Sequence, residues 1–172
     1  PQDGYDALSD AWSNNPGAFK DIAVGGGRVS LLYNYVDGQS GLAETRYGLI
    51  DEERKININK IDATTLERLF QLVLDFDEIQ AQELSASIID WRDGDSQLSL
   101  PLGSAEDSYY RNLQYPYEAK DAEFELLEEL LLVKGMTQEV FEKLKDYVAI
   151  YGSGKININT APKEVLMALG LS

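Results

Sequence analysis

Oxygen-bearing side chains provide nearly all of the chemistry that this sequence can offer. Its 172 residues include 30 Asp and Glu but no Cys and no His. The chain therefore has no thiol nucleophile, disulfide or Ser–His–Asp triad, and it lacks the usual ligands of zinc and haem. Carboxylate, amide and hydroxyl oxygens remain, and these are the donors that hard cations such as calcium prefer.

One acidic segment has the spacing of a cation site. Asp93 and Asp95 alternate across Gly94, as in the first part of an oxygen-ligand loop for calcium. Two further acids follow soon after, and four carboxylates without a basic partner repel one another unless a divalent cation binds. The candidate ligands are Asp93, Asp95, Glu106 and Asp107, with Gln97 or Ser99 as weaker contributors.

Two other interpretations of these acids stay open. On the residues alone, a solvated polar turn in which Asp caps nearby helices and loops is the more common arrangement. Paired carboxylates also carry out glycoside hydrolysis, but nothing in the sequence places two of them across a sugar-sized cleft. The acids thus indicate a metal site or a polar turn, and an enzyme active site is the least supported interpretation.

The composition is typical of a globular protein that buries a sizeable core. Apolar residues make up 44% of the chain, and the length fits one domain or one domain with a large insertion. The 15 Lys and Arg against 30 Asp and Glu give a formal charge of −15. Such a field repels phosphate backbones and anionic lipid, so nucleic acid is a poor partner. No stretch approaches the roughly 18 to 20 apolar residues that a membrane span needs.

The first sixty or so residues predict a helix end followed by strands. Tyr5, Leu8 and Trp12 have the spacing of one helical face, so residues 1–12 are expected to end a helix. Strands are expected where β-branched and aromatic residues gather, over residues 29–36, 46–50 and 55–59. A Gly-rich turn precedes the first of these strands, and a loop separates it from the second.

From Asp62 the apolar residues recur with a period of about 3.6, which predicts a helical segment. Asp62 is expected to cap the first helix, and Thr137 a later one. The predicted helices include residues 66–73, 78–91, 124–131 and 137–148. The long connection over 93–122 needs a function or a ligand to order it. A strand over 148–159 and a short helix from Thr160 are expected to follow.

A five-residue motif occurs twice. Lys55-Ile56-Asn57-Ile58-Asn59 recurs as Lys155-Ile156-Asn157-Ile158-Asn159, and a helix is expected after each copy. In a strand, the Ile pair and the Asn pair point to opposite faces. Because an amide pair carries no chemistry by itself, we expect each Asn to fix a strand-to-helix junction through bonds to nearby backbone.

Four motifs, in order along the chain, resemble a known family. They are Asp90-Trp91-Arg92-Asp93-Gly94-Asp95, Gly103-Ser104-Ala105-Glu106-Asp107, Glu128-Glu129-Leu130-Leu131-Leu132-Val133-Lys134-Gly135, and Ile156-Asn157-Ile158-Asn159-Thr160-Ala161-Pro162. Their sequence and spacing resemble the type II secretion minor pseudopilin K family, also called general secretion pathway protein K. Tyr5, Leu8 and Trp12 look like the end of that family's stalk helix.

The resemblance implies an α+β fold, in which a long N-terminal helix packs on a small antiparallel sheet. Residues 1–60 and 147–172 would form this pilin-like domain, with the hydrophobic N-terminal helix missing and the C-terminal strands truncated. Residues 61–146 would form an inserted all-α domain of the SAM-like or helix-hairpin-helix-like type. The domain boundaries are therefore expectations from the family.

The same resemblance implies a non-enzymatic role in protein export. Members of the family sit with two other minor pseudopilins in a heterotrimeric complex at the tip of a periplasmic pseudopilus, where they start assembly and engage secreted proteins. The full-length protein would be anchored in the inner membrane through the missing N-terminal helix. Family members also bind calcium in the inserted domain, which favours a metal site at Asp93, Asp95, Gln97, Glu106 and Asp107.

The alternative function is a DNA-binding module related to the competence receptors, because the helical pairs also resemble helix-hairpin-helix units. Such units hold phosphate through a Gly-rich hairpin whose backbone N–H groups face the DNA. The first hairpin, residues 72–77, has no glycine and contains Asp75 and Asp77. The second keeps only one glycine, Gly135, and the helices have few Lys or Arg. We therefore expect no nucleic-acid partner.

Overall fold

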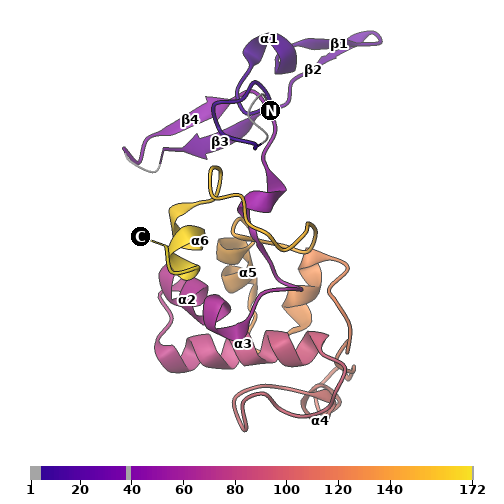
Figure 1. Cartoon of the computed structure of the whole chain (residues 1–172). Helices are drawn as coiled ribbons and strands as arrows, with labels where there is room; N and C mark the ends of the chain where they lie inside the picture. The colour runs from indigo at the N-terminus through magenta and orange to yellow at the C-terminus, as the bar shows by residue number, and fades with distance from the viewer. Residues whose placement is uncertain (1–4, 38–39, 172) are drawn as a thin grey trace.

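The computed structural model describes residues 5–37 and 40–171, and two parts can be distinguished in it (Figure 1). The hairpin region, residues 15–50, contains α1 (Pro16–Phe19), β1 (Ile22–Val24), β2 (Gly27–Val29), β3 (Tyr33–Val36) and β4 (Ala43–Arg46). The 3-10 turn η1 (Glu52–Arg54) leads into the helical body, residues 56–171. That body contains β5 (Ile56–Asn57), α2 (Ala63–Leu74), α3 (Glu78–Arg92), α4 (Asp107–Tyr110), η2 (Leu127–Leu132), α5 (Gln138–Leu144), β6 (Val148–Ala149) and α6 (Lys163–Ala168).

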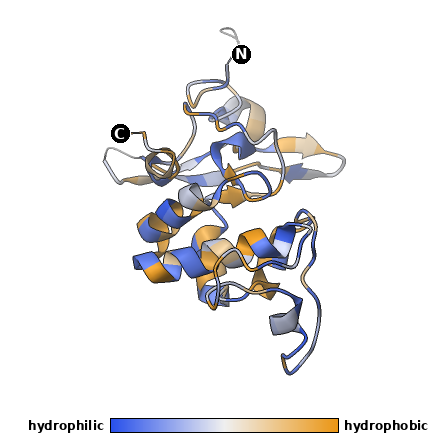
Figure 2. Ribbon diagram, turned by 60° about the horizontal axis from the view of Figure 1, so that its bottom comes forward, coloured by the Kyte–Doolittle hydropathy of each residue, from blue (hydrophilic) through white to orange (hydrophobic). Residues whose placement is uncertain are grey.

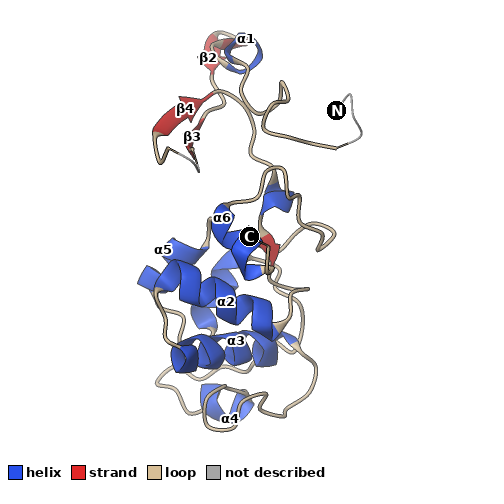
Figure 3. Cartoon of the chain, turned by 60° about the vertical axis from the view of Figure 1, so that its left-hand side comes forward, coloured by secondary structure: helices blue, strands red, loops and turns tan. Residues whose placement is uncertain are grey.

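The strands form three separate two-stranded sheets in the described part of the chain. β1 pairs with β2 and β3 with β4 in antiparallel hairpins, and Figure 3 shows these hairpins at the opposite end of the molecule from α3 and α4. The third pair is parallel, with Ile56 opposite Val148 and Asn57 opposite Ala149. The mixed α+β class is therefore confirmed, whereas the single antiparallel sheet that the family resemblance implied is not what these strands form.

The two long helices follow the expected caps and apolar faces. The Asp62 carboxylate accepts a hydrogen bond from the Thr65 N–H at 3.0 Å and caps α2. Asp77 and Gln80 form a reciprocal capping box at the start of α3. α2 packs against α3, α5 and α6, so it lies at the centre of the helical body.

The core gathers apolar side chains from every layer of the helical body. Figure 2 shows that its helices carry both hydrophobic and hydrophilic residues along their length, as amphipathic helices do. The largest fully buried apolar side chains are Ile56, Ile58, Leu66, Leu69, Phe70, Ile88, Tyr110, Leu130, Leu144, Val148 and Val165. Because β5, β6 and α6 contribute to this list, the motif copy at 55–59 and the C-terminal helix belong to the same core.

The helix expected over residues 1–12 is not formed by the residues described there, 5–12, which make turns; residues 1–4 lie outside the described residues. The Asp10 carboxylate accepts a hydrogen bond from the Ala7 N–H at 3.0 Å, and the Asp10 N–H donates to the Ala7 carbonyl at 2.9 Å. Trp12 accepts a backbone bond from Leu49. Local side-chain-to-backbone bonds have thus replaced the helical ladder.

Several other boundaries differ from the expected ones. The segment expected as one strand over 29–36 is divided between β2 and β3, and β4 ends at Arg46 instead of beginning there. The expected helix over 124–131 is the 3-10 turn η2. The strand expected over 148–159 is limited to β6, because Gly152 and Gly154 adopt positive φ values of 97° and 81° that end the extended run.

Across residues 5–37 and 40–171, none of the helices is both long enough and apolar enough to span a lipid bilayer.

Candidate metal centre

Three of the predicted ligands converge just beyond the end of α3. Asp93 caps that helix, with its N–H donating to the Ile89 carbonyl, and Asp95 follows in the next turn. Glu106 stands at the start of α4. One carboxylate oxygen from each of Asp93, Asp95 and Glu106 lies within 4.8 Å of the other two. Three converging carboxylates match the donor set of a hard cation such as calcium.

Two carboxylate oxygens of these residues are buried without a hydrogen-bond partner among the described residues. They are Oδ1 of Asp93 and Oε1 of Glu106, whose side chain is 4% exposed. An unpaired buried carboxylate oxygen is costly, and a bound cation would satisfy both atoms. The residues present therefore fit a calcium ion.

The pKa values of these acids reflect the same crowding. Burial raises the pKa of Glu106 to about 7, and repulsion from Asp90, Asp93, Asp121 and Asp95 adds to this effect. Burial also raises the pKa of Asp93, and the neighbouring acids act in the same direction. A cation would reverse this balance because it favours the ionised form of each carboxyl group.

The neighbouring basic side chains are directed elsewhere. Both terminal nitrogens of Arg92 donate to backbone carbonyls, one at Ile58 and one at Ile61. Lys134 donates to the carbonyls of Gly103 and Ser104, at 2.8 and 3.3 Å. Among the residues that the structure describes, no Lys or Arg forms an ion pair with Asp93, Asp95 or Glu106.

The remaining sequence candidates make other contacts with their surroundings. Asp107 forms an ion pair with Arg111 at 2.7 Å and accepts a hydrogen bond from the Ala119 N–H at 2.9 Å. Gln97 donates its backbone N–H to the Asp95 carboxylate at 2.8 Å. Ser99 likewise donates its N–H to Asp90. Gln97 and Ser99 thus bond Asp95 and Asp90 through their backbone N–H groups. Asp107 instead holds the long connection through its bonds to Arg111 and Ala119.

Two acids near the site were missed by the sequence reasoning. Asp90 is completely buried on the last turn of α3, three residues before Asp93, and this spacing places both on one helical face. Asp121 is distant in sequence, but its N–H donates to the Trp91 carbonyl at 3.1 Å and brings it to the end of α3. The helical spacing could have identified Asp90, whereas nothing local in the sequence indicates Asp121.

An aromatic cluster supports the loop that carries Glu106. The Tyr110 ring is fully buried, lies edge-on to Trp91 with centroids 5.1 Å apart, and stacks on Tyr117 at 5.2 Å. The Tyr117 hydroxyl donates to the Leu132 carbonyl at 2.7 Å. These rings attach the long connection to the core, so Glu106 approaches the end of α3 on an ordered segment.

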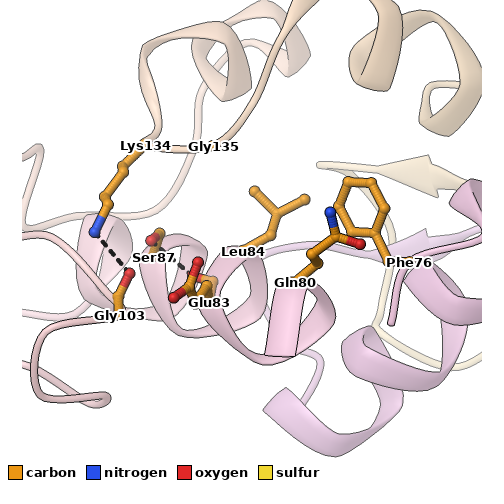
Figure 4. Close-up of a pocket in the computed structure, with 8 residues that line it drawn as sticks. All are labelled: Phe76, Gln80, Glu83, Leu84, Ser87, Gly103, Lys134 and Gly135. Carbon is orange, nitrogen blue, oxygen red and sulfur yellow. Dashed lines mark hydrogen bonds between the residues drawn. The ribbon is translucent and has the colours of Figure 1, made fainter. Parts of the chain in front are cut away.

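A small pocket lies beside α3, between that helix and the turn before α5 (Figure 4). Its volume is about 190 Å³, and its lining includes Phe76, Leu84 and Lys134. Ligand pockets usually measure about 300 to 1,000 Å³, so this one is small for a substrate. The adjacent α2–α3 hairpin holds Asp75 in the left-handed region and Asp77 as a cap. Two acids at this position disfavour contact with a phosphate backbone.

Comparison with known proteins gave a consistent set of similarities. Residues 41–153 match the family described as type II secretion system (T2SS), protein K. The chain is 35% identical over 103 residues to the type II secretion system protein K of Aeromonas hydrophila, which corresponds to 57% of this chain and 31% of that protein. The chain thus spans about a third of the length of this curated relative.

A solved structure has a similar fold. It is the crystal structure of the GspK–GspI–GspJ complex from the type 2 secretion system of enterotoxigenic Escherichia coli. One chain of that complex superposes with a TM-score of 0.68 at 22% sequence identity, covering 96% of this chain and 57% of the other. At this identity the likeness establishes a shared fold.

Proposed function

The chain belongs to the protein K family of the type II secretion system, and on that premise we propose that it is a non-enzymatic minor pseudopilin that works at the pseudopilus tip. Its partners would be the counterparts of GspI and GspJ, in a heterotrimeric complex that starts assembly and takes part in protein export. The full-length protein would act in the periplasm and be held at the inner membrane by an N-terminal helix. The observation that carries this proposal is the family match over residues 41–153, together with the fold shared with a chain of the GspK–GspI–GspJ complex.

The domain organisation expected from the family is part of this proposal. Residues 61–146 would be an inserted helical domain, and residues 1–60 with 147–172 would belong to a pilin-like domain. The hairpins of residues 15–50, at the opposite end of the molecule from α3 and α4, support a separate N-terminal part, whereas β5, β6 and α6 share the core of the helical body. Because α6 packs against α2, the two proposed domains would share an extensive contact.

Calcium would hold the long connection of the helical body in place. The supporting observation is the convergence of Asp93, Asp95 and Glu106, two of which have buried oxygens without partners. Asp90 and Asp121 would add negative charge around the ion. The ion would supply only charge and coordination, and the protein would use it to fix the end of α3 to the start of α4.

Calcium titration by calorimetry tests the metal site. The parent chain should bind calcium saturably, and Glu106→Gln should weaken binding by at least about tenfold because it removes one ligand charge. Glu125→Gln is the matched control, because the Glu125 side chain is 84% exposed and, among the described residues, pairs only with Lys120. Removing calcium should also lower the melting temperature and expose residues 93–107 to protease. Absence of binding by the folded parent chain would contradict the proposal.

Reconstitution tests the assembly role separately. The chain should form a stable complex of one copy of each subunit when it is mixed with the soluble domains of its two partner pseudopilins, as measured by size exclusion with light scattering. A folded chain that fails to bind either partner would overturn the tip-subunit proposal. The result does not depend on the calcium titration, so the two proposals can fail independently.

A further inference from the structure

The segment that follows α3 begins with an Asp-Gly pair, Asp93-Gly94. An aspartate followed by glycine is the pair in which a carboxyl side chain reacts most readily with its own backbone, because glycine has no Cβ to crowd the attacking nitrogen. The reaction requires that the peptide unit between the two residues can rotate and that water can reach it. Both conditions can be examined in the structure.

The peptide unit between Asp93 and Gly94 has no hydrogen bond to hold it. Neither the Asp93 carbonyl nor the Gly94 N–H has a partner among residues 5–37 and 40–171. Gly94 is exposed, and a Cβ built on it would meet no atom within 4 Å. Its φ lies outside the left-handed region, so the backbone does not require glycine at this position. Rotation of this unit therefore breaks no bond and meets no obstacle.

The Asp93 carboxylate is also held less firmly than two comparable acids. Asp95 and Asp107 each precede a serine, but both have strong partners. The Asp95 carboxylate accepts the Gln97 N–H at 2.8 Å, and Asp107 forms its ion pair with Arg111 at 2.7 Å. The Asp95 N–H lies near the Asp93 carboxylate, but Oδ1 of Asp93 has no donor within the described chain. A carboxyl group with an unpartnered oxygen loses less when it leaves its position to react.

We propose that Asp93-Gly94 is a site of spontaneous rearrangement to isoaspartate when no cation is bound to the acidic cluster. The Gly94 nitrogen attacks Cγ of Asp93 and forms a new C–N bond, and the carboxyl hydroxyl leaves with the amide proton as one water molecule. The product is a five-membered succinimide ring. One water molecule then adds to either ring carbonyl and breaks its C–N bond, which yields aspartate or isoaspartate. The net mass is unchanged, and no oxidant or reductant is needed.

Isoaspartate at this position would remove one carboxylate from the cluster. The backbone gains a methylene group at residue 93 and the side chain loses one, so the geometry that brings oxygens of Asp93, Asp95 and Glu106 within 4.8 Å of one another is lost. A bound cation would prevent the reaction, because it would hold the Asp93 carboxylate away from the Gly94 nitrogen. This protection rests on the proposed calcium site, whereas the rearrangement itself does not.

Peptide mapping of aged protein tests the proposal. The folded parent chain is incubated at neutral pH with a chelator, digested, and analysed by mass spectrometry, in which isoaspartate appears as a peptide of unchanged mass and altered retention. We expect isoaspartate to accumulate at residue 93, and Gly94→Ala to slow this by at least about fivefold because the added Cβ crowds the nitrogen. Gly26→Ala is the matched control, because a Cβ on Gly26 likewise meets no atom within 4 Å and the residue before it is glycine.

Calcium provides the second part of the experiment. At about ten times its dissociation constant, calcium should slow the reaction at residue 93 by about tenfold, since only the cation-free protein reacts. The other Asp-Gly pairs of the sequence, Asp3-Gly4 and Asp37-Gly38, are internal references whose rates should not change. Protein that is aged without calcium and then titrated by calorimetry should have lost calcium sites in proportion to the isoaspartate at residue 93.

The possible contrary results distinguish the rearrangement from the metal site. A residue 93 that stays aspartate while a synthetic peptide of residues 90–97 rearranges would overturn the proposal, and so would equal rates in Gly94→Ala and the parent chain. Calcium that binds in calorimetry without slowing the reaction would overturn the protection and leave the metal site intact. If the parent chain binds no calcium, the metal site and the protection fail together, and the peptide map still decides the rearrangement.

Discussion

At the scale of single residues, burial and mutual repulsion both disfavour the ionised acids of the cluster, and one bound cation would offset both. Glu106 is almost completely buried beside other acids, so its ionised form is unfavourable unless a cation binds. The sequence indicated Asp93, Asp95 and Glu106 because they lie in short acidic motifs. It also suggested Asp107, and adjacency alone could not show that this carboxylate turns toward Arg111.

The raised pKa of Glu106 predicts a pH dependence in calcium-free buffer. Because the folded pKa of about 7 exceeds the ordinary value of 4.5, the folded state binds the proton more tightly than the unfolded state. Ionising Glu106 in the folded state costs stability. This cost is absent below about pH 4.5, increases as the pH rises through 7, and then stays constant. The free energy of unfolding of Glu106→Gln, relative to that of the parent chain, should therefore increase by on the order of 2 kcal/mol between pH 5 and pH 8.

Chemical denaturation of both chains across that pH range measures this difference. The other titrating groups are common to the two proteins, so their contributions cancel in the comparison. A stability difference that is independent of pH would mean that Glu106 titrates normally. With calcium present the trend should reverse, because protons then compete with the ion for the same oxygens.

Asp107 and Glu106 are neighbours in sequence, and we predict different roles for them. Asp107→Asn should leave calcium affinity within about threefold of the parent value, because only the Arg111 pair and the Ala119 bond are affected. It should lower stability by about 1 kcal/mol through the weakened bond to the loop. Calorimetry and thermal melting of Asp107→Asn beside Glu106→Gln measure both effects. Equal losses of affinity in the two variants would place Asp107 among the ligands.

At the scale of elements, α3 connects the cluster to the core through its last turn. Arg92 is largely buried there and donates to the carbonyls of Ile58 and Ile61, which belong to the turn of the first motif copy. Burial lowers its pKa, yet the guanidinium stays charged because its ordinary value is so high. The end of α3 is thereby fixed to the turn that follows β5, and its next residue is Asp93.

Arg92→Lys should destabilise the protein by about 1 to 2 kcal/mol, because one ammonium nitrogen would replace the two guanidinium nitrogens that each bond a different carbonyl. Lys143→Arg on α5 is the matched control, because Lys143 is half-exposed and its one ion pair within the described part of the chain is with Glu139. Urea unfolding of the two variants gives the comparison. We expect Arg92→Lys also to lower calcium affinity, since the loop begins at the next residue.

The elements also show where sequence reasoning succeeded and where it could not. α2 and α3 were predictable because capping residues and apolar periodicity agree at Asp62 and at Ala81, Leu84 and Ile88. The prediction of a helix was wrong for the described residues 5–12. Three spaced apolar residues suggested a helical face, but the Asp10 carboxylate bonds the Ala7 N–H and stabilises a turn instead. The position of Asp121 depends on a backbone bond to Trp91, a tertiary contact that no local pattern encodes.

At the scale of the whole molecule, the formal charge of −15 destabilises the compact state through self-repulsion. Monovalent salt should therefore raise the melting temperature of the calcium-free protein, because exposed charges are screened over about 8 to 10 Å at physiological ionic strength. The same salt should weaken calcium binding. Melting curves from low to high sodium chloride, with and without calcium, measure both trends, and a fall in stability with added salt would contradict this account.

The parallel pairing of β5 with β6 has a consequence for the order in which the chain acquires its structure. The hairpins of the first fifty or so residues are local and can form soon after they are synthesised, whereas Ile56 and Ile58 wait for the carbonyls of Tyr147 and Ala149. Closing so long a loop costs entropy before any core contact compensates for it. The helical body should therefore fold slowly and as one unit. A nascent chain that ends before Val148 would emerge with β5 and α2 still exposed to chaperones and proteases.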